Sequence, residues 1–276
     1  MTVLIHPTAV IEPGADLHPT VQVGAYAVIG SRVKVGAGTV IGHHAVLDGW
    51  TEIGTNNQIF PGAAIGLDPQ DLKYNGSLTL VQIGNNNVIR EYVTIHRATQ
   101  TDEATIIGNG NLLMANVHVA HNCVIEDQVI LANAVALSGH VHIESRARLS
   151  GVLGVHQFVR IGRYAMVGGM TKIVRDVPPY MLVDGNPAKV RSLHQIGLRR
   201  AGLTELDNGT VYASLKKAFR LLYRSGLTFT EAIEQFSLLP ENEHLHHLQQ
   251  FLIASQSSGR RGLTPGVRRF SHEEEG

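Results

Sequence analysis

Histidines are concentrated in the middle of the chain, where they could act together in acid–base chemistry. The sequence holds 15 histidines in 276 residues, and five of them fall within a stretch of 39 positions: His118, His121, His140, His142 and His156. Neutral imidazole, with an ordinary pKa of about 6.5, can accept a proton from a hydroxyl group near neutral pH. A backbone N–H beside a glycine can approach a developing oxyanion closely. A histidine placed next to a glycine would therefore suit acyl transfer to a hydroxyl group.

A repeat of six residues supplies the elements that would position these groups. Positions spaced by six in three runs, Ile5 to Ile65, Ile83 to Ile95 and Ile107 to Ile173, are all Ile, Leu or Val. Glycine often follows directly, and asparagine or a small residue often comes two places later. The pattern predicts short strands with inward aliphatic residues, joined by tight turns in which Gly and Asn tolerate left-handed backbone. Three hexads make a triangular coil of about 18 residues, and coils stack at about 4.8 Å.

The length of the coil predicts which functional residues lie on neighbouring rungs. His121 should stack on Gly139, and Asn122 on His140, because each pair is 18 positions apart. His121 could then act as a general base while the Gly139 N–H stabilises an oxyanion. The alternative interpretation is that these histidines are exposed corner residues without a chemical role.

Two segments interrupt the repeat, and the pattern stops after Pro178-Pro179. Residues 71–82 and 101–106 keep the phase of six but lack the pattern, so we expect loops that carry functional residues or are merely tolerated insertions. Helices are expected from Lys189 onward, over 204–223, 228–239 and 241–255. The sequence thus predicts a mainly β protein with a parallel β-helix over 1–186, a small α-helical domain over 187–256 and a disordered tail over 257–276.

Composition and charge argue against several classes of function. Lys plus Arg and Asp plus Glu both number 23, so no net charge favours nucleic acid or an anionic membrane. The sequence has no 18-residue apolar stretch and no secretory leader, so we expect no stable membrane insertion. Cys123 is the only cysteine, which rules out an internal disulfide and favours a reducing, cytoplasmic location.

Seven motifs resemble one family of sugar-nucleotide acyltransferases. They are QDLKYNG (70–76), IREYVTIHRAT (89–99), NLLMANVHVAHNCVI (111–125), ILANAVALSGHV (130–141), VHQF (155–158), MVGGM (166–170) and DVPPY (176–180). They resemble the motifs of UDP-N-acetylglucosamine acyltransferases, the first enzymes of lipid A assembly, and the similarity runs from about His6 to about Gly226. The resemblance implies a left-handed β-helix, an exception to the usual right-handed crossover, and a homotrimer with sites between subunits.

The resemblance also implies an activity and a set of site residues. The activity is transfer of a 3-hydroxyacyl chain from acyl carrier protein to the 3-position of UDP-N-acetylglucosamine, without a cofactor or a metal. His121 would be the general base, and the Gly139 N–H would bind the oxyanion. The residues implied in substrate binding are Gln70, Asp71, Lys73, His118, Asn122, His140, His156, Gln157, Gly169 and Arg200.

Some of these residues carry more specific expectations. Gln70, Asp71 and Lys73 would lie in a loop that reaches a neighbouring subunit's site. Gly169 would end the groove that measures acyl length, and Arg200 would face a phosphate or the nucleotide. A solvated lysine at position 73 and an ordinary corner glycine at position 169 are the alternative interpretations.

Three positions depart from the family pattern. Asn122 stands where an aspartate often follows the catalytic histidine, and an amide can orient an imidazole without stabilising its charge. An Asn122→Asp change is therefore expected to shift the pH optimum upward. Ala201 replaces the second of two arginines and His194 replaces an asparagine, so the family's nucleotide contacts do not carry over to these positions.

Other functions remain as alternatives at this stage. A carbonic-anhydrase-like site would need three histidines around one zinc ion, and extended backbone does not bring His118 and His121 to one face. A related N-acyltransferase carries a large N-terminal nucleotide-binding domain, which is not expected here because the repeat begins at Ile5. A pure scaffold would not need the histidine cluster. The helix with Lys216, Lys217, Arg220 and Arg224 is either a docking face for an acidic carrier protein or a solvated face.

Overall fold

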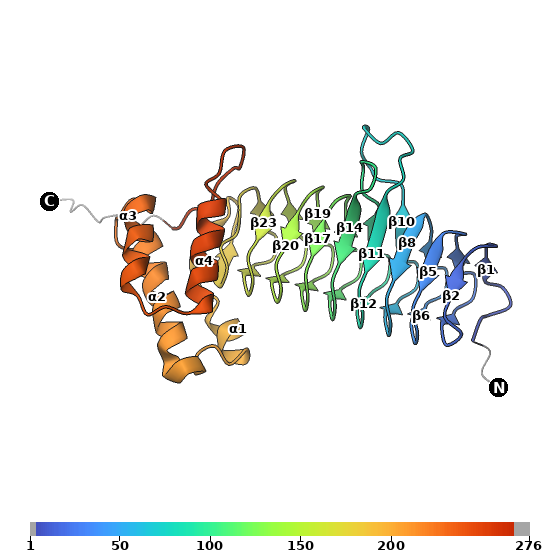
Figure 1. Ribbon diagram of the computed structural model, residues 1–276, viewed down its shortest axis with the longest axis horizontal. Coiled ribbons are helices and arrows are strands. Elements are labelled where there is room, and N and C mark those ends of the chain that lie inside the picture. Colours follow the sequence, from blue (N-terminus) through green and yellow to red (C-terminus); the bar gives the residue numbers. More distant parts are fainter. Residues whose placement is uncertain (1–3, 268–276) are drawn as a thin grey trace.

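A long coil of short strands, capped at one end by helices, makes up the computed structural model, which describes residues 4–267 (Figure 1). The coil is a left-handed parallel β-helix with three sheets as its sides. The first sheet contains β1 (Val10–Ile11), β4 (Val28–Ile29), β7 (Val46–Leu47), β10 (Ala64–Leu67), β13 (Thr94–His96), β16 (His118–Val119), β19 (Ala136–Leu137), β22 (Gly154–Val155) and β25 (Lys172–Ile173). The second contains β2 (Asp16–Leu17), β5 (Val33–Val35), β8 (Trp50–Ile53), β11 (Leu80–Ile83), β14 (Ala104–Ile107), β17 (Val124–Ile125), β20 (His142–Ile143) and β23 (Arg160–Ile161). The third contains β3 (Gln22–Val23), β6 (Val40–Ile41), β9 (Gln58–Ile59), β12 (Val88–Ile89), β15 (Leu112–Leu113), β18 (Ile130–Leu131), β21 (Arg148–Leu149), β24 (Met166–Val167), β26 (Met181–Asp184) and β27 (Lys189–Leu193).

The register of the coils confirms the predicted repeat. Leu112 pairs with Ile130, a step of 18 residues. The step rises to 30 between Thr51 and Val81 and to 24 between Val88 and Leu112, so both interruptions preserve the phase of six. The expected loops 71–82 and 101–106 are wrong at their last residues, because β11 begins at Leu80 and β14 at Ala104. The first loop projects from the coil between β10 and β11 (Figure 1).

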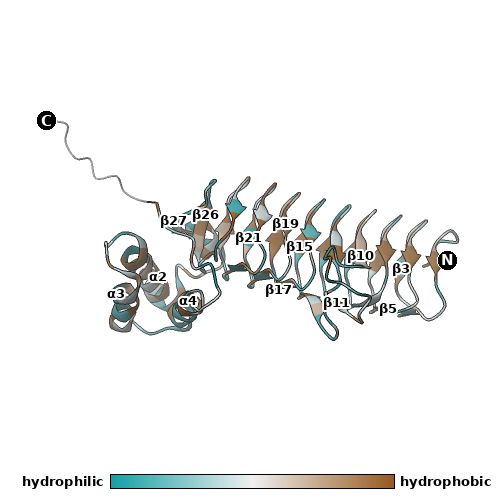
Figure 2. Cartoon of the chain, turned by 90° about the horizontal axis from the view of Figure 1, so that it is seen from above, coloured by the Kyte–Doolittle hydropathy of each residue, from teal (hydrophilic) through white to brown (hydrophobic). Residues whose placement is uncertain are grey.

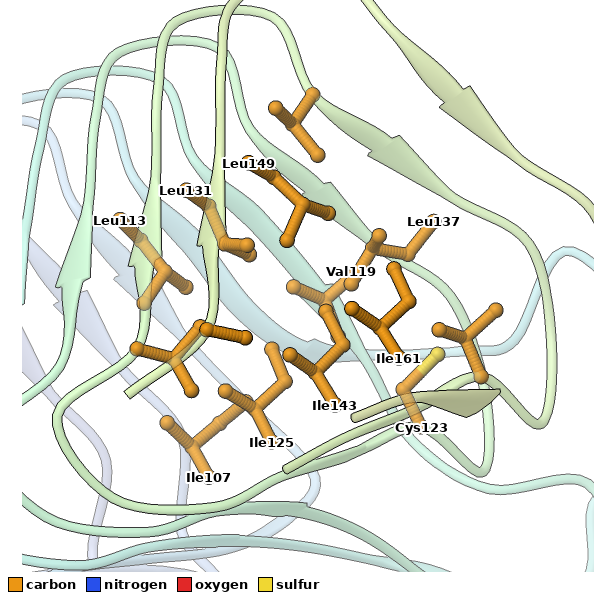
Figure 3. Packing of buried hydrophobic residues seen from close by; sticks show 14 of the residues in the cluster. Ile107, Leu113, Val119, Cys123, Ile125, Leu131, Leu137, Ile143, Leu149 and Ile161 are labelled. Atoms are coloured by element: carbon orange, nitrogen blue, oxygen red, sulfur yellow. The ribbon is translucent and has the colours of Figure 1, made fainter. Parts of the chain in front are cut away.

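The core is a set of aliphatic ladders that run through the coil. Every residue of the sixfold series from Val23 to Ile173 is buried, while Ile5 at the open end is 43% exposed. Figure 3 shows such a ladder, in which Ile107, Ile125 and Ile143 lie one above another. Hydrophobic residues recur along the whole coil rather than gathering in one place (Figure 2). Truncating one such isoleucine to alanine costs about 2–5 kcal/mol, so the stack fixes the position of each corner.

The corners differ in one respect from the sequence prediction. The left-handed residue is the third after the inward aliphatic one, as at Asn56 (φ 55°) and Asn86 (φ 57°). Apart from Gly66 (φ 83°), the glycines that directly follow the aliphatic residue do not adopt left-handed backbone. A Cβ on Gly36 would lie 2.8 Å from the backbone of Gly54 in the next coil. These glycines therefore permit close stacking of the turns.

The chain leaves the coil later than predicted. Residues Lys189–Leu193 were expected to be helical, but they form β27, which pairs antiparallel with β26. The domain boundary expected between residues 186 and 187 falls in the turn between these two strands. The helices that follow are α1 (Gln195–Arg200), η1 (Leu206–Gly209), α2 (Thr210–Tyr223), α3 (Phe229–Glu234), η2 (Gln235–Leu238) and α4 (Glu243–Ala254). The predicted helix over 204–223 is broken because Asp207 and Asn208 adopt left-handed backbone.

Polar contacts join the helices and the C-terminal segment to the end of the coil. The Tyr180 hydroxyl lies 3.2 Å from Nδ1 of His244 in α4. Arg260 donates hydrogen bonds to both carboxylate oxygens of Asp176, at 3.0 and 2.8 Å. The prediction of a disordered tail is wrong for residues 257–267, because Leu263 and Gly266 also form β-bridges to the coil. Residues 268–276 of that prediction lie outside the described part.

Candidate functional site

The candidate site lies at the corner of the coil that follows β16, β19 and β22. His121 and Gly139 stack there as the spacing predicted: a Cβ on Gly139 would lie 2.5 Å from His121 Nε2. Only glycine at position 139 leaves room for the imidazole. Gly139 is buried, and within residues 4–267 its N–H makes no hydrogen bond.

A hydrogen bond to Asn122 orients the imidazole of His121. Nδ1 of His121 lies 2.9 Å from Oδ1 of Asn122. The same oxygen accepts a hydrogen bond from the Thr99 N–H at 3.2 Å, while Nδ2 of Asn122 donates to Oε2 of Glu103 at 2.6 Å. Because Oδ1 is thereby an acceptor, the network assigns the proton of neutral His121 to Nδ1. Nε2 then carries the free lone pair that a general base needs.

Asp71 lies on the other side of the imidazole. Its Oδ2 is 3.8 Å from His121 Nε2 and accepts a hydrogen bond from the Thr99 hydroxyl at 3.1 Å. The Lys73 N–H, then the Thr99 hydroxyl and His121, lower the pKa of the Asp71 carboxyl against the opposing effect of burial. The loop was expected to reach a neighbouring subunit's site, but Asp71 lies beside His121 of its own chain. Gln70 and the side chain of Lys73 are exposed.

Two further histidines, His140 and His118, flank the corner. His140 lies edge-on to His121, with ring centroids 5.2 Å apart, and stacks on Phe158 at 4.6 Å. Burial, followed by the nearby His121, lowers the pKa of His140. The side chain is half-buried, and Phe158 covers one face of its ring.

His118 occupies the strand that leads into the same corner. Its Nδ1 lies 2.7 Å from the Thr94 hydroxyl, and its ring lies edge-on to His96 at 5.3 Å. Burial, followed by the nearby His96, lowers the pKa of His118. His96 is itself buried, with Nδ1 2.6 Å from the Asp68 carbonyl oxygen, so it has a structural partner.

The remaining predicted site residues fall into a near group and a distant group. Gln157 is exposed two coils from His121 on the same corner, and His156 precedes it with Nδ1 3.1 Å from the Gln157 carbonyl oxygen. Gly169 follows β24 and Arg200 ends α1, so one chain does not bring either residue to the His121 corner. Gly169 stacks on Gly151, because a Cβ added at 169 would lie 3.3 Å from the Gly151 carbonyl oxygen.

The two helical departures from the family pattern have structural explanations. His194 is buried and its Nδ1 lies 3.0 Å from the Tyr164 carbonyl oxygen, and burial lowers its pKa. Ala201 is the C-cap of α1. Neither residue is placed to contact a ligand at the His121 corner.

The described part of the chain holds neither a metal-binding cluster nor a membrane-spanning helix. Over residues 4–267, no three His, Cys, Asp or Glu side chains converge in a way that could hold a metal ion. Within the same part of the chain, no helix has the length and apolar character needed to cross a bilayer.

Sequence reasoning missed Glu103, Thr99 and Phe158. Phe158 could have been found, because it is 18 residues beyond His140 on the same corner. Glu103 belongs to the second interruption and Thr99 lies just before it, between β13 and β14, where the repeat gives no information on side-chain position.

Comparisons with known proteins identify one family for this chain. Residues 176–264 match the family described as Udp N-acetylglucosamine O-acyltransferase, domain 2, and residues 14–49 and 104–139 match the bacterial transferase hexapeptide. An acyl-[acyl-carrier-protein]–UDP-N-acetylglucosamine O-acyltransferase of Gloeothece citriformis is 60% identical over 216 residues, 78% of this chain and 77% of that protein. A protein of the same name from Anaeromyxobacter sp. is 47% identical over 262 residues, 94% of this chain and 99% of that protein. The crystal structure of UDP-N-acetylglucosamine O-acyltransferase from Moraxella catarrhalis has a TM-score of 0.88 and 43% identity, covering 95% of this chain and all of that one.

Proposed function

The chain belongs to the acyl-[acyl-carrier-protein]–UDP-N-acetylglucosamine O-acyltransferases. On that premise we propose that His121 is the general base that deprotonates the sugar 3-hydroxyl during its acylation. The acyltransferases of this family begin lipid A synthesis. The observation that carries the proposal is the stacking of His121 on Gly139, with its Nδ1 held by Asn122. In this arrangement Nε2 faces the corner where a hydroxyl group would be deprotonated and an oxyanion would accept a hydrogen bond.

The proposed chemistry is one addition and one elimination. Nε2 of His121 takes the proton of the sugar hydroxyl as its oxygen attacks the thioester carbonyl of the acyl carrier. The Gly139 N–H donates a hydrogen bond to the tetrahedral oxyanion. The intermediate then collapses to the ester, and the departing carrier thiolate takes the proton from the imidazolium. The ionised Asp71 beside Nε2 favours the imidazolium and can orient the incoming hydroxyl.

The surrounding residues suit a substrate that is partly polar and partly apolar. His118, His140 and Gln157 offer hydrogen-bonding groups on adjacent rungs, and Phe158 adds an exposed aromatic face. We infer that these residues, with His156, Gln70 and Lys73, contact the sugar nucleotide and the proximal part of a 3-hydroxyacyl chain. In this proposal Arg200 faces the nucleotide of a bound substrate.

A basic cleft on the helical part suits the acyl carrier protein. The cleft has a volume of about 430 Å³, and its lining includes Lys216, Lys217, Arg220 and Arg224. Carrier proteins are acidic, so charge complementarity would steer the donor to this face. We therefore extend the proposal to docking of the carrier against α2, in a cytoplasmic enzyme that needs neither a cofactor nor a metal.

The distant position of Gly169 supports a homotrimer. Its corner follows the third sheet, whereas His121 follows the first, so one coil cannot line both ends of an acyl groove. A neighbouring copy that packs its third-sheet corner against the His121 corner would complete the groove. We propose that the active protein is a trimer with sites of this kind.

The His121→Ala variant tests the central assignment. General bases contribute about 10²- to 10⁴-fold to turnover, so kcat should fall by at least about 100-fold while the trimer and its melting temperature persist. The measurement is ester formation from a 3-hydroxyacyl carrier and UDP-N-acetylglucosamine, with His142→Ala as the control because His142 pairs with Glu126 on another corner. A His121→Ala enzyme that keeps more than a tenth of the wild-type rate would show that the base is another group.

A further inference from the structure

We propose that Glu103 is a positioning residue that acts on His121 through the side-chain amide of Asn122. The proposal rests on the proposed role of His121 as the general base. It assigns a function to the second interruption of the coil, which the repeat itself leaves without one. The three side chains form one line of hydrogen bonds, from the imidazole to the amide to the carboxylate.

The amide of Asn122 is held in one orientation by its neighbours. Its Nδ2 donates to Glu103 Oε2 at 2.6 Å, and its Oδ1 accepts from the Thr99 N–H at 3.2 Å. Its main-chain N–H donates to the Thr105 hydroxyl at 2.9 Å. A flipped amide would place its oxygen against the Glu103 carboxylate and its NH₂ group against the Thr99 N–H, so both contacts oppose the flip. Glu103 thereby keeps Oδ1 directed at His121 Nδ1.

The Glu103 carboxylate also supplies charge that the amide lacks. When His121 takes a proton in the reaction, its Nδ1–H becomes a stronger donor to Asn122, and an amide polarised by an anion accepts that bond better. The carboxylate is half-buried and accepts a further hydrogen bond from the Gln100 N–H at 3.3 Å, so it has a fixed position. Its negative charge also reaches His140, whose pKa it raises against the larger lowering effects of burial and His121.

This line of groups accounts for the asparagine after the catalytic histidine. A carboxylate directly bonded to Nδ1 would both orient the imidazole and stabilise its charge. In this chain the orienting group and the charge are separate residues, and the charge lies one side chain further from the imidazole. An aspartate at 122 would face Glu103 across a contact that measures 2.6 Å in the present structure, so the two positions should depend on each other.

The first test compares Glu103→Gln with Asp102→Asn. Both changes remove one carboxylate from the same loop and keep the side-chain shape, and the exposed Asp102 makes no side-chain hydrogen bond or ion pair within residues 4–267. We expect Glu103→Gln to lower kcat roughly fivefold to tenfold with little change in KM, and to move the acidic limb of the kcat/KM profile on the order of half a pH unit downward. The downward direction follows because loss of a nearby anion lowers the pKa of the base. Asp102→Asn should leave both quantities at their wild-type values.

The second test uses Asn122→Asp with and without Glu103→Gln. Asn122→Asp alone places two carboxylates in contact, so kcat should fall more than in Glu103→Gln. The double variant supplies a donor at position 103 for the new carboxylate at 122 and places the charge next to His121. Its kcat should exceed that of Asn122→Asp by roughly tenfold, a coupling that a merely structural glutamate would not produce.

The outcomes separate this inference from the proposed function. An active His121→Ala variant would overturn the proposed function and this inference together. An inactive His121→Ala variant, combined with Glu103→Gln whose rate and pH profile match those of Asp102→Asn, would overturn the role of Glu103 alone. A double variant no faster than Asn122→Asp would also contradict it.

Discussion

The absence of a side chain at position 139 determines where the imidazole of His121 can lie. The stacking of these two residues could be predicted from the sequence, because a step of 18 residues returns the chain to the same corner one coil later. The network behind the imidazole could not be predicted in this way. Glu103 and Thr99 reach Asn122 from a loop of seven residues outside the repeat (97–103), and their positions depend on tertiary contacts.

Replacing Gly139 with alanine should displace the imidazole of His121 without unfolding the coil. The backbone at Gly139 has an ordinary φ, but an added Cβ would lie 2.5 Å from His121 Nε2. The ring must therefore leave Asn122, and we expect kcat to fall by roughly 10²- to 10³-fold while thermal unfolding changes little. Gly154→Ala is the control in steady-state kinetics, since its Cβ would meet no atom within 4 Å. Near wild-type turnover in Gly139→Ala would mean that the stacked geometry is not needed for catalysis.

At the scale of elements, the strands were easier to predict than their interruptions and the end of the coil. The inward series is regular because each member packs on the same position of the next coil, and this constraint is visible in the sequence. The sequence of β27 was misjudged because an antiparallel strand of five residues at the end of the coil breaks the sixfold series. Likewise, the residues that fix the loop over 68–79 are far from it in the sequence.

Arg97 fixes that loop, and its removal should separate the loop from the site. The guanidinium is buried and donates to the Gly66 carbonyl oxygen and the Tyr74 hydroxyl, both at 2.9 Å, and it pairs with Asp68. In Arg97→Ala these acceptors lose their donor, at a cost of about 2–3 kcal/mol in the free energy of unfolding. The freed loop carries Asp71, so kcat should fall roughly tenfold.

Trypsin gives a direct readout of this change. Lys73 is exposed in the loop, and cleavage there should become faster in Arg97→Ala as the loop loses its anchor. Arg90→Ala is the matched control, because Arg90 lies in the same coil but pairs with Glu91. Equal cleavage rates in the two variants would show that other contacts hold the loop.

At the scale of the whole molecule, one chain does not bring all of the proposed site residues together. The His121 corner follows the first sheet, and the stacked glycines 151 and 169 lie on a corner that follows the third. The sequence places both stacks correctly within the coil. It cannot show how separate copies pack, because the contacts between copies do not follow the period of the repeat.

The proposed acyl slot at Gly151 and Gly169 provides a test of whether two copies share one site. Each buried methylene contributes about 0.8 kcal/mol, so a large side chain in the slot should selectively weaken long donors. We expect Gly169→Met to shift the ratio of kcat/KM toward 3-hydroxyacyl carriers that are several carbons shorter.

Mixed trimers test whether the slot belongs to a neighbouring copy. If it does, mixing Gly169→Met chains with His121→Ala chains creates some sites that combine an intact His121 from the first variant with an intact Gly169 from the second. Random mixing in equal amounts should then restore about one quarter of wild-type activity toward long donors, although neither variant alone has it. Light scattering on the same samples should give the mass of a trimer. A mixture as inactive with long donors as its two components would place His121 and the acyl slot in the same chain's site, and an unchanged donor ratio in Gly169→Met would show that the groove ends elsewhere.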